Sequence, residues 1–417
     1  MHICIFQTGE PLHIDIGNYR PMRAMLLADE LLKEGNKVTI ISSSFFHQRK
    51  IFRSKSFKKV NLKENFSIIL IPSLGYKKHI GFKRLFDHIF LSINLYQFLR
   101  NNKKFKPDKV FIGYPPIESS FVIMNWAKKN NIPIMLDVKD NWPENFIEAL
   151  PNFLKKFGRL LLFPYFILTT YIFNNADAVS SITKSFINWI KTFENKQNKT
   201  FSKSIYFVSP LVRKKIIFNQ KILKEATEFW HKKGINVIEK KHFSFVGSLS
   251  NSFDFKFILN ISNFLITKYP NYIIIICGTG DKYLELKQLF SNSPNVMLVG
   301  EIDKYKASIL IKHSVASLAP YLNNQNFQNS IPNKVIESLE NSVPFITNTQ
   351  GELKKMIEEF DNGIFLDKDL KDIEKISSLI ENKEFLNNLQ RNSFKSFEAL
   401  FNFEKTYQKI ICNLKKI

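Results

Sequence analysis

The stretch from Asn329 to Glu337 places polar side chains where a helix is expected to begin. Pro332 suits the first turn of that helix, because proline lacks an N–H group that would be unpaired there. Backbone N–H groups at such a helix start, between Ile331 and Lys334, can hold an anion. Glu337 lies about one and a half turns further on and can accept hydrogen bonds from sugar hydroxyls. The pattern therefore predicts binding of a sugar attached to an anion, and the alternative is a helix with one solvated acid.

A long loop follows the first expected strand and contains two glycines and an arginine. Gly9 and Gly17 would let the backbone approach a phosphate, and Arg20 stands near the start of the next helix. Long loops at strand ends often carry function. We predict that this loop contacts phosphate, and the alternative is a flexible surface loop.

Two further side chains could take part in proton transfer. His47 follows the second expected strand, in a serine-rich segment that continues with basic residues, and an imidazole there could donate or accept a proton. Asp140 lies in the run Asp-Val-Lys-Asp-Asn-Trp-Pro-Glu at the end of another expected strand, where carboxylates beside a Trp-Pro turn suit an acceptor site. The alternative for His47 is a polar surface residue.

These residues need a scaffold of parallel strands. Apolar strand-like runs alternate with helical segments throughout the chain, which predicts an α/β fold with parallel sheets covered on both faces. The expected strands are 2–6, 37–42, 67–72, 109–113, 132–137, 178–182 and 204–208, and then 242–246, 272–277, 296–299, 316–319, 343–346 and 363–366. Ligands bind at the carboxyl ends of such strands. We predict an N-terminal Rossmann-like domain over 1–205, a C-terminal one over 206–393, and a final helix over 394–417.

Glycines also follow two strands of the second series. Gly247 follows the strand 242–246, and Gly278 and Gly280 follow the strand 272–277. The second pair lacks the third glycine of a dinucleotide fingerprint, so NAD is not the predicted ligand.

Composition restricts the partners and the compartment. The formal net charge of +23 is compatible with nucleic acid, an anionic membrane or phosphorylated substrates, but no nucleic-acid recognition module is visible. Cys4, Cys277 and Cys412 are far apart and odd in number, which favours a reducing compartment without disulfides. No signal peptide is visible, and the longest apolar run, 160–173, is shorter than the roughly 20 residues of a membrane span.

The segment 76–106 is amphipathic and strongly basic. Phe82, Phe86 and Phe90 recur at helical spacing, with lysines and arginines around them and Asp87 as the one acid. We predict peripheral contact with an anionic membrane. The alternative is that the stripe packs on its own sheet.

The run from Ile331 to Phe365 resembles the C-terminal signature of glycosyltransferase family 4. In that family two glutamates eight positions apart bind the donor, and Glu337 matches the second, which implies ribose binding. The first position is Asn329, a departure that affects how the donor sugar is held.

The Gly9–Gly17 loop with Arg20, and the turns at Gly247, Gly278 and Gly280, also resemble the family's donor-binding turns. Ser248 and Asn251 stand near the places where many members have Arg and Lys on the diphosphate, so Arg213 and Lys334 become candidates for that charge. The predicted donor-binding residues are therefore Gly9, Gly17, Arg20, Arg213, Gly247, Gly278, Gly280, Asn329, Pro332, Asn333, Lys334 and Glu337.

The segments around His47 and Asp140 resemble the acceptor side of bacterial surface-polysaccharide transferases. The resemblance implies a GT-B architecture, with two Rossmann-like domains, a cleft between them and a C-terminal helix that crosses back. It implies a retaining, metal-independent transfer from a nucleotide-sugar, expected to be UDP-linked, with no cofactor. The acceptor would be lipid-linked or a glycan of the O-antigen or capsule type, and the enzyme would be cytoplasmic, at the inner membrane face.

The pair Asp367 and Asp369 is expected to cap a helix rather than to bind a metal.

Two other classes remain open on the sequence. A UDP-N-acetylglucosamine 2-epimerase shares the two-domain architecture, and it would convert its nucleotide-sugar without any acceptor. A basic, non-catalytic membrane-binding protein would explain the charge, and binding to anionic liposomes would separate such a face from a merely solvated one.

Overall fold

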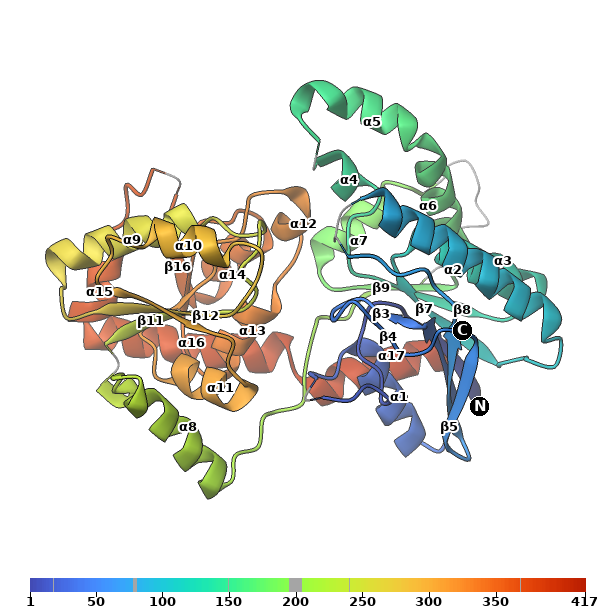
Figure 1. Ribbon diagram of the computed structural model, residues 1–417, viewed down its shortest axis with the longest axis horizontal. Helices are drawn as coiled ribbons and strands as arrows, with labels where there is room; N and C mark the ends of the chain where they lie inside the picture. Colours follow the sequence, from blue (N-terminus) through green and yellow to red (C-terminus); the bar gives the residue numbers. More distant parts are fainter. Residues whose placement is uncertain (18, 78–80, 149, 195–204, 240, 368) are drawn as a thin grey trace. The chain divides into compact units, whose positions relative to one another are not determined.

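The computed structural model describes the chain from 1 to 417 except residues 18, 78–80, 149, 195–204, 240 and 368. The chain forms two compact units (Figure 1). Unit 1 contains Met1–Arg213 together with Phe403–Ile417, and unit 2 contains Lys214–Asn402. The chain thus passes between units at 213/214 and 402/403, whereas the domain ranges expected from sequence change at 205/206 and 393/394.

Unit 1 is built on an eight-stranded sheet in the order β10-β9-β8-β7-β1-β2-β6-β5. The strands are β1 (His2–Phe6), β2 (Lys37–Ser43), β5 (Lys58–Lys63), β6 (Phe66–Ile71), β7 (Lys109–Tyr114), β8 (Ile134–Val138), β9 (Ala178–Ser181) and β10 (Ile205–Val208). All neighbouring pairs are parallel except β5 with β6, which is antiparallel. The strand order reverses between β1 and β7, and this is where an open α/β sheet leaves room for a ligand.

Helices cover both faces of this sheet (Figure 1). They are α1 (Arg23–Lys33), α2 (Phe82–Asn101), α3 (Ile117–Lys129), α4 (Glu144–Glu148), α5 (Lys155–Leu161), α6 (Phe163–Asn175), α7 (Lys184–Lys191) and α17 (Phe403–Lys416), and a short hairpin of β3 (Phe45–Phe46) and β4 (Ile51–Phe52) lies beside the sheet. One helical layer contains α2, α3 and α6, because α2 packs on α3 and α3 packs on α6. The C-terminal helix α17 packs against α1 on unit 1.

Unit 2 contains a six-stranded, fully parallel sheet in the order β13-β12-β11-β14-β15-β16. The strands are β11 (His242–Val246), β12 (Ile273–Cys277), β13 (Val296–Gly300), β14 (Ser317–Leu318), β15 (Phe345–Thr347) and β16 (Gly363–Phe365). The helices are α8 (Gln220–Lys232), α9 (Phe255–Lys268), α10 (Tyr283–Leu289), α11 (Lys304–Lys312), α12 (Gln325–Gln328), α13 (Asn333–Glu340), α14 (Glu352–Phe360), α15 (Lys375–Glu381) and α16 (Lys383–Leu400). This order reverses between β11 and β14, so unit 2 has a ligand position equivalent to that of unit 1.

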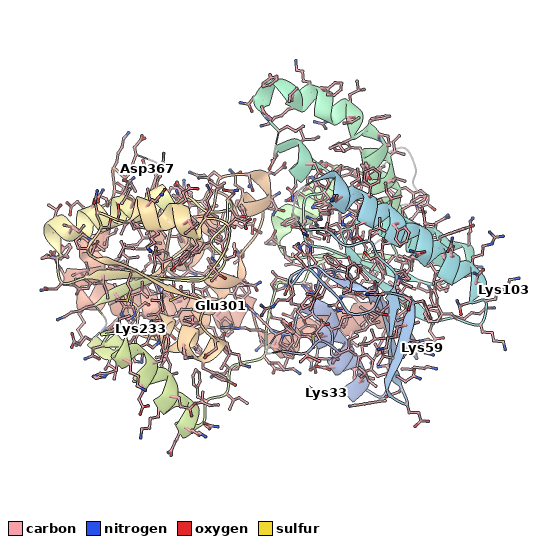
Figure 2. The ribbon with its side chains drawn as sticks, in the orientation of Figure 1. Lys33, Lys59, Lys103, Lys233, Glu301 and Asp367 are labelled. Carbon is pink, nitrogen blue, oxygen red and sulfur yellow. The ribbon has the colours of Figure 1, made fainter. Side chains whose placement is uncertain are left out.

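The apolar runs of the sequence form the centre of each sheet. In unit 1, Val110, Phe111 and Ile112 of β7 are fully buried, as expected for a parallel strand with helices on both faces. Charged side chains project outward from unit 1, as Lys33 and Lys103 do in Figure 2. The predicted fold class, α/β with two doubly wound Rossmann-like domains, is confirmed.

Helix α2 does not bury Phe86 and Phe90 of its predicted stripe, so the alternative of a stripe packed on its own sheet is wrong for them, and the Phe82 side chain lies outside the described residues. Phe86 and Phe90 are exposed, whereas Leu91, Leu95 and Leu99 face the core. Within the part of the chain that the structure describes, no helix is both long and apolar enough to span a membrane.

Candidate functional site

A pocket of about 330 Å³ opens in unit 1 where its strand order reverses. The residues after β1, which include Gly9, form one wall, and the turn after β7, which includes Pro115, forms another. His47 and Asp140 both line this pocket. The fold therefore brings together the two side chains that the sequence analysis selected for acceptor chemistry.

Hydrogen bonds determine which ring nitrogen of His47 carries its proton. The Tyr76 hydroxyl lies 2.6 Å from His47 Nδ1, and Lys50 Nζ lies 3.3 Å from the same nitrogen. Arg84 hydrogen-bonds to the Tyr76 hydroxyl. Arginine and lysine can only donate, so Arg84 donates to Tyr76, and both Tyr76 and Lys50 donate to Nδ1. A neutral His47 therefore carries its proton on Nε2 and acts as a hydrogen-bond donor.

Burial shifts the pKa of two members of this cluster. It raises the pKa of Tyr76 to about 12, so the phenol stays protonated near neutral pH. Burial, assisted by the nearby Arg84 charge, lowers the pKa of Lys50 to about 8. The aromatic ring of Tyr76 also lies 4.7 Å from the Lys50 ammonium, within cation–π distance.

An aromatic and cationic wall faces the pocket beside Asp140. The Arg84 guanidinium lies 5.0 Å from the centre of the Trp142 ring, and His88 stacks on Trp142 at 5.8 Å. Burial and the Arg84 charge lower the pKa of His88 to about 3, so His88 is neutral near pH 7. Tyr114 donates to the Trp142 carbonyl at 2.7 Å and holds this wall in position. Such a surface suits stacking against a sugar ring or an anionic group.

A buried network of charges lies beneath the pocket. Lys139 contacts Glu10 at 2.5 Å and Asp137 at 3.9 Å, and Arg23 contacts Asp137 at 3.4 Å. Arg23 also donates to the hydroxyl and carbonyl oxygens of Ser209 at 2.5 and 2.6 Å. Two cations balance two carboxylates, and the network joins the loop after β1 to the ends of β8 and β10.

The sequence analysis did not identify this network or the Arg84–Tyr76–His47 chain. The Arg23 side chain, at the start of α1, is buried and holds Ser209. One signal was available, because a charge within a buried strand, as at Asp137 of β8, requires a partner. The identity of that partner depends on contacts between residues more than a hundred positions apart.

In unit 2, two glycine turns meet at the strand ends of the reversal point. Gly247 follows β11 and donates its N–H to the Cys277 carbonyl at 2.9 Å. A Cβ atom on Gly278 would lie 1.8 Å from the Gly247 carbonyl oxygen, and Gly278 has a φ of +143°. Only glycine permits this approach. Gly280 lies in the same turn, so the three predicted glycines converge.

Lys334 reaches this turn from the start of α13. A Cβ atom on Gly247 would lie 2.2 Å from Lys334 Nζ, so the missing side chain provides the space for the ammonium. Nζ is buried without a hydrogen-bond acceptor among the described residues, and it lies 3.8 Å from the ring centres of both Phe245 and Phe253. Burial lowers the pKa of Lys334 to about 7, which the negative charge of Glu337 opposes.

Helix α13 has the predicted apolar face and the predicted start. Pro332 is extended just before the helix, Asn333 is its first residue, and Val335, Ile336 and Leu339 are buried. Glu337 is half-buried and lines a small cavity of about 10 Å³ together with Lys334. Asn329 directly follows α12, and its backbone N–H donates to the Gln325 carbonyl at 3.0 Å.

The remaining predicted donor residues lie in unit 1. Gly17 and Arg20 belong to the loop before α1, and Arg213 is the last residue of unit 1 before the chain enters unit 2. Asp367 of unit 2, labelled in Figure 2, accepts from the Lys371 backbone N–H at 3.2 Å. It closes a turn before α15 instead of capping that helix directly. Among the described residues, no three His, Cys, Asp or Glu side chains gather closely enough to hold a metal ion.

Comparison with known proteins adds a family and a fold. Residues 226–396 match the family model described as glycosyl transferases group 1. No curated protein sequence matches the chain. The sucrose-phosphate synthase of Thermosynechococcus elongatus superposes with a TM-score of 0.71 at 13% identity, over 100% of this chain and 98% of that one. Anabaena HepE in complex with UDP has a TM-score of 0.66 at 11% identity and covers 100% of both chains.

A third similar structure is WaaG, a glycosyltransferase involved in lipopolysaccharide biosynthesis. Its TM-score is 0.62 at 12% identity, over 98% of each chain. At such identities the structures establish the shared GT-B fold, and the group 1 match covers the unit 2 turns and α13. With both findings together, the chain is a glycosyltransferase.

Proposed function

We propose that the protein transfers a sugar from a nucleotide-sugar, expected to be a UDP-sugar, to a lipid-linked or polysaccharide acceptor in cell-surface glycan synthesis. The observation that carries this proposal is the convergence of Gly247, Gly278 and Lys334 at the strand ends of unit 2, inside the segment that matches group 1. Backbone turns and an ammonium beside a helix start are suited to a diphosphate. HepE and the Escherichia coli trehalose-6-phosphate protein were crystallised with UDP and UDP-2-fluoro-glucose respectively, which supports UDP as the carrier.

In the proposed reaction, unit 2 holds the donor. Glu337 accepts hydrogen bonds from the ribose, and Lys334 with the N–H groups at the start of α13 faces the diphosphate. The bond between the anomeric carbon and the diphosphate oxygen breaks, and its electron pair leaves with the nucleotide. Preorganised dipoles and one cation stabilise that charge, and this supports a transfer without a divalent metal. Gly9, Gly17, Arg20 and Arg213 remain predicted donor contacts.

Unit 1 is proposed to bind the acceptor in its pocket. Asp140 is proposed to contact the acceptor by accepting a hydrogen bond from a hydroxyl beside the attacking one. The attacking oxygen forms the new bond to the anomeric carbon, and its proton passes to the leaving phosphate oxygen. The Nε2–H of His47 is proposed to donate to an oxygen of the acceptor. The hydrogen bonds at His47 Nδ1 therefore favour the role of a hydrogen-bond donor over that of a proton-accepting base.

The finer parts of the proposal concern stereochemistry, family and location. We propose retention at the anomeric carbon, membership of family 4, an acceptor of the O-antigen or capsule type, and a cytoplasmic enzyme at the inner membrane face, where the segment 76–106 contacts anionic lipid. The free cysteines Cys4, Cys277 and Cys412 support a reducing compartment.

Calorimetry with UDP, followed by a transfer assay, tests the donor site. We expect Glu337→Ala to weaken UDP binding about tenfold to a hundredfold, because a charged hydrogen-bond partner of the ribose is lost. The control is Glu358→Ala, whose carboxylate is exposed on α14 and pairs with Lys354. Undiminished UDP binding by Glu337→Ala would refute the ribose assignment.

Two further measurements separate the alternatives. Activity that disappears in EDTA and returns with Mg²⁺ would contradict the metal-free proposal. Conversion of UDP-N-acetylglucosamine without any acceptor would identify an epimerase instead of a transferase.

A further inference from the structure

Unit 1 exposes a dense group of large apolar side chains on the segment that contains α5 and the start of α6. We call this group the α5 patch, and its members are Phe153, Leu154, Phe157, Leu160, Leu161, Phe163 and Ile167. Phe153 is 82% exposed, Leu160 72% and Phe157 63%. Single apolar residues on a surface are ordinary, but a contiguous group of this kind marks an interaction site.

The backbone explains why these side chains remain exposed among the described residues of unit 1. The only buried residue of α5 is Gly158, and a Cβ atom there would lie 2.4 Å from Leu150 Cδ1. Helix α5 is therefore held at one narrow point, and the rest of its surface turns away from the unit. Figure 1 shows α5 projecting beyond α6, past the layer that contains α2 and α3.

The charge of the same segment indicates what covers the patch. Lys155, Lys156 and Arg159 lie among the apolar residues, and the sequence has no Asp or Glu from 149 to 176. Apolar side chains surrounded by cations fit a surface that is apolar inside and anionic outside, as a bilayer with anionic headgroups is. A second copy of the chain fits poorly, because a symmetric contact through this patch would place the same three cations against each other.

A second exposed row lies in the same helical layer. Helix α2 exposes Phe86, Ile93 and Tyr96, while its opposite side contributes Arg84 and His88 to the unit 1 pocket. One helix thus links an exposed apolar surface to the pocket proposed for the acceptor.

We propose that the α5 patch is the principal membrane-docking element of the protein, and that it enters the boundary between headgroups and acyl chains of an anionic bilayer. This deepens the membrane contact of the proposed function, which assigned that contact to segment 76–106. The docking itself does not require sugar transfer.

Sedimentation of the full chain with sucrose-loaded vesicles tests the proposal. Vesicles of phosphatidylcholine alone are compared with vesicles that also contain phosphatidylglycerol. We expect binding to the anionic vesicles only, and we expect Phe153→Ser/Phe157→Ser/Leu160→Ser to lower the partition coefficient by about tenfold or more, because the buried apolar area is lost. These side chains are exposed, so the substitutions leave the fold intact.

Matched controls locate the effect on the patch. The variant Ile217→Ser/Ile238→Ser/Leu284→Ser removes three side chains of unit 2 that are 83%, 63% and 74% exposed, and it should bind vesicles like the unchanged protein. A further variant, Phe86→Ser/Ile93→Ser/Tyr96→Ser, removes the α2 row. Binding that survives the α5 substitutions and falls only with those in α2 would overturn the assignment, as would equal binding to neutral vesicles.

Two measurements separate this proposal from other outcomes. A dimer in light scattering that dissociates in the α5 variant would overturn docking to lipid in favour of self-association. UDP affinity is measured on the same variant and should be unchanged. If the unchanged protein fails to bind UDP yet binds anionic vesicles, the donor proposal fails while the docking proposal stands.

Discussion

At the scale of single residues, Lys334 is held in surroundings that oppose its charge. Its ammonium is buried between the turn at Gly247 and the rings of Phe245 and Phe253, and no described acceptor reaches it. The rings and Glu337 favour the charged form, but desolvation outweighs them and lowers the pKa to about 7. Such a lysine gains most from an incoming anion, which is the role proposed for it.

The lowered pKa of Lys334 makes its effect on stability depend on pH. In the unfolded chain its pKa is about 10.4, so the cost of burying the charge is fully present below about pH 7 and declines as the pH rises towards 10. We expect Lys334→Met to raise the free energy of unfolding by on the order of 3 kcal/mol at pH 6, and by progressively less at pH 8 and 9.5. Urea denaturation at each pH measures the difference. Lys355→Met, at an exposed position, is the control, and a gain independent of pH would contradict the assignment.

The proton position on His47 gives a second prediction at this scale. Tyr76→Phe removes the nearer of the two donors to Nδ1 and leaves Lys50 at 3.3 Å, so the Nδ1–H tautomer becomes more accessible. We expect long-range ¹H–¹⁵N spectra to show the Nε2–H form in the unchanged protein and a mixture in the variant, with transfer activity lowered about tenfold. His47→Gln identifies the signal, and Tyr96→Phe on the exposed face of α2 is the control. An Nδ1–H form in the unchanged protein would exclude the donor role.

At the scale of elements, the carboxyl ends of strands are held together by buried charges. The loop after β1 supplies Glu10, whose carboxylate also accepts from the Ala24 N–H at the start of α1. The end of β8 supplies Asp137 and Lys139, and α1 supplies Arg23. The network therefore fixes where α1 begins and holds one wall of the unit 1 pocket.

Removal of one cation from this network should destabilise the folded protein. Lys139→Met removes one of the two cations that balance the buried carboxylates of Glu10 and Asp137. We therefore expect the free energy of unfolding to fall by about 3–5 kcal/mol. The exposed pair Lys128–Asp177 provides the comparison, and Lys128→Met should change stability by no more than about 1 kcal/mol. Equal effects in the two variants, measured by urea denaturation, would show that the network contributes no more than a surface pair.

At the scale of the whole molecule, the two units repeat one arrangement. Each has a mainly parallel sheet whose order reverses near its centre, and each places candidate site residues after the strands at that reversal. The chain crosses between units twice, and α17 belongs to unit 1 although it follows unit 2 in the sequence. Ligands of the two units should therefore leave separate signatures.

Hydrogen exchange with and without UDP tests this division. At a hundredfold excess over Kd, UDP should stabilise the binding unit by about 2.7 kcal/mol. We expect slower exchange at 246–251, 277–281 and 331–338 of unit 2, and no change in the edge strand β5. Protection confined to unit 1 would reassign the donor site.

The sequence by itself determined the alternation of strands and helices, and hence two doubly wound domains, because hydrophobic periodicity is a local property. It also made Gly247, Gly278, Lys334 and Glu337 candidates, from glycines after strands, polar residues at a helix start and a family resemblance, and their role in donor binding stays a prediction. The tertiary structure alone decided that Arg23 holds Ser209, that Tyr76 orients His47 and that Phe86 and Phe90 of α2 face outward. Each of these depends on which distant segment contacts a side chain, and the local sequence does not specify that segment.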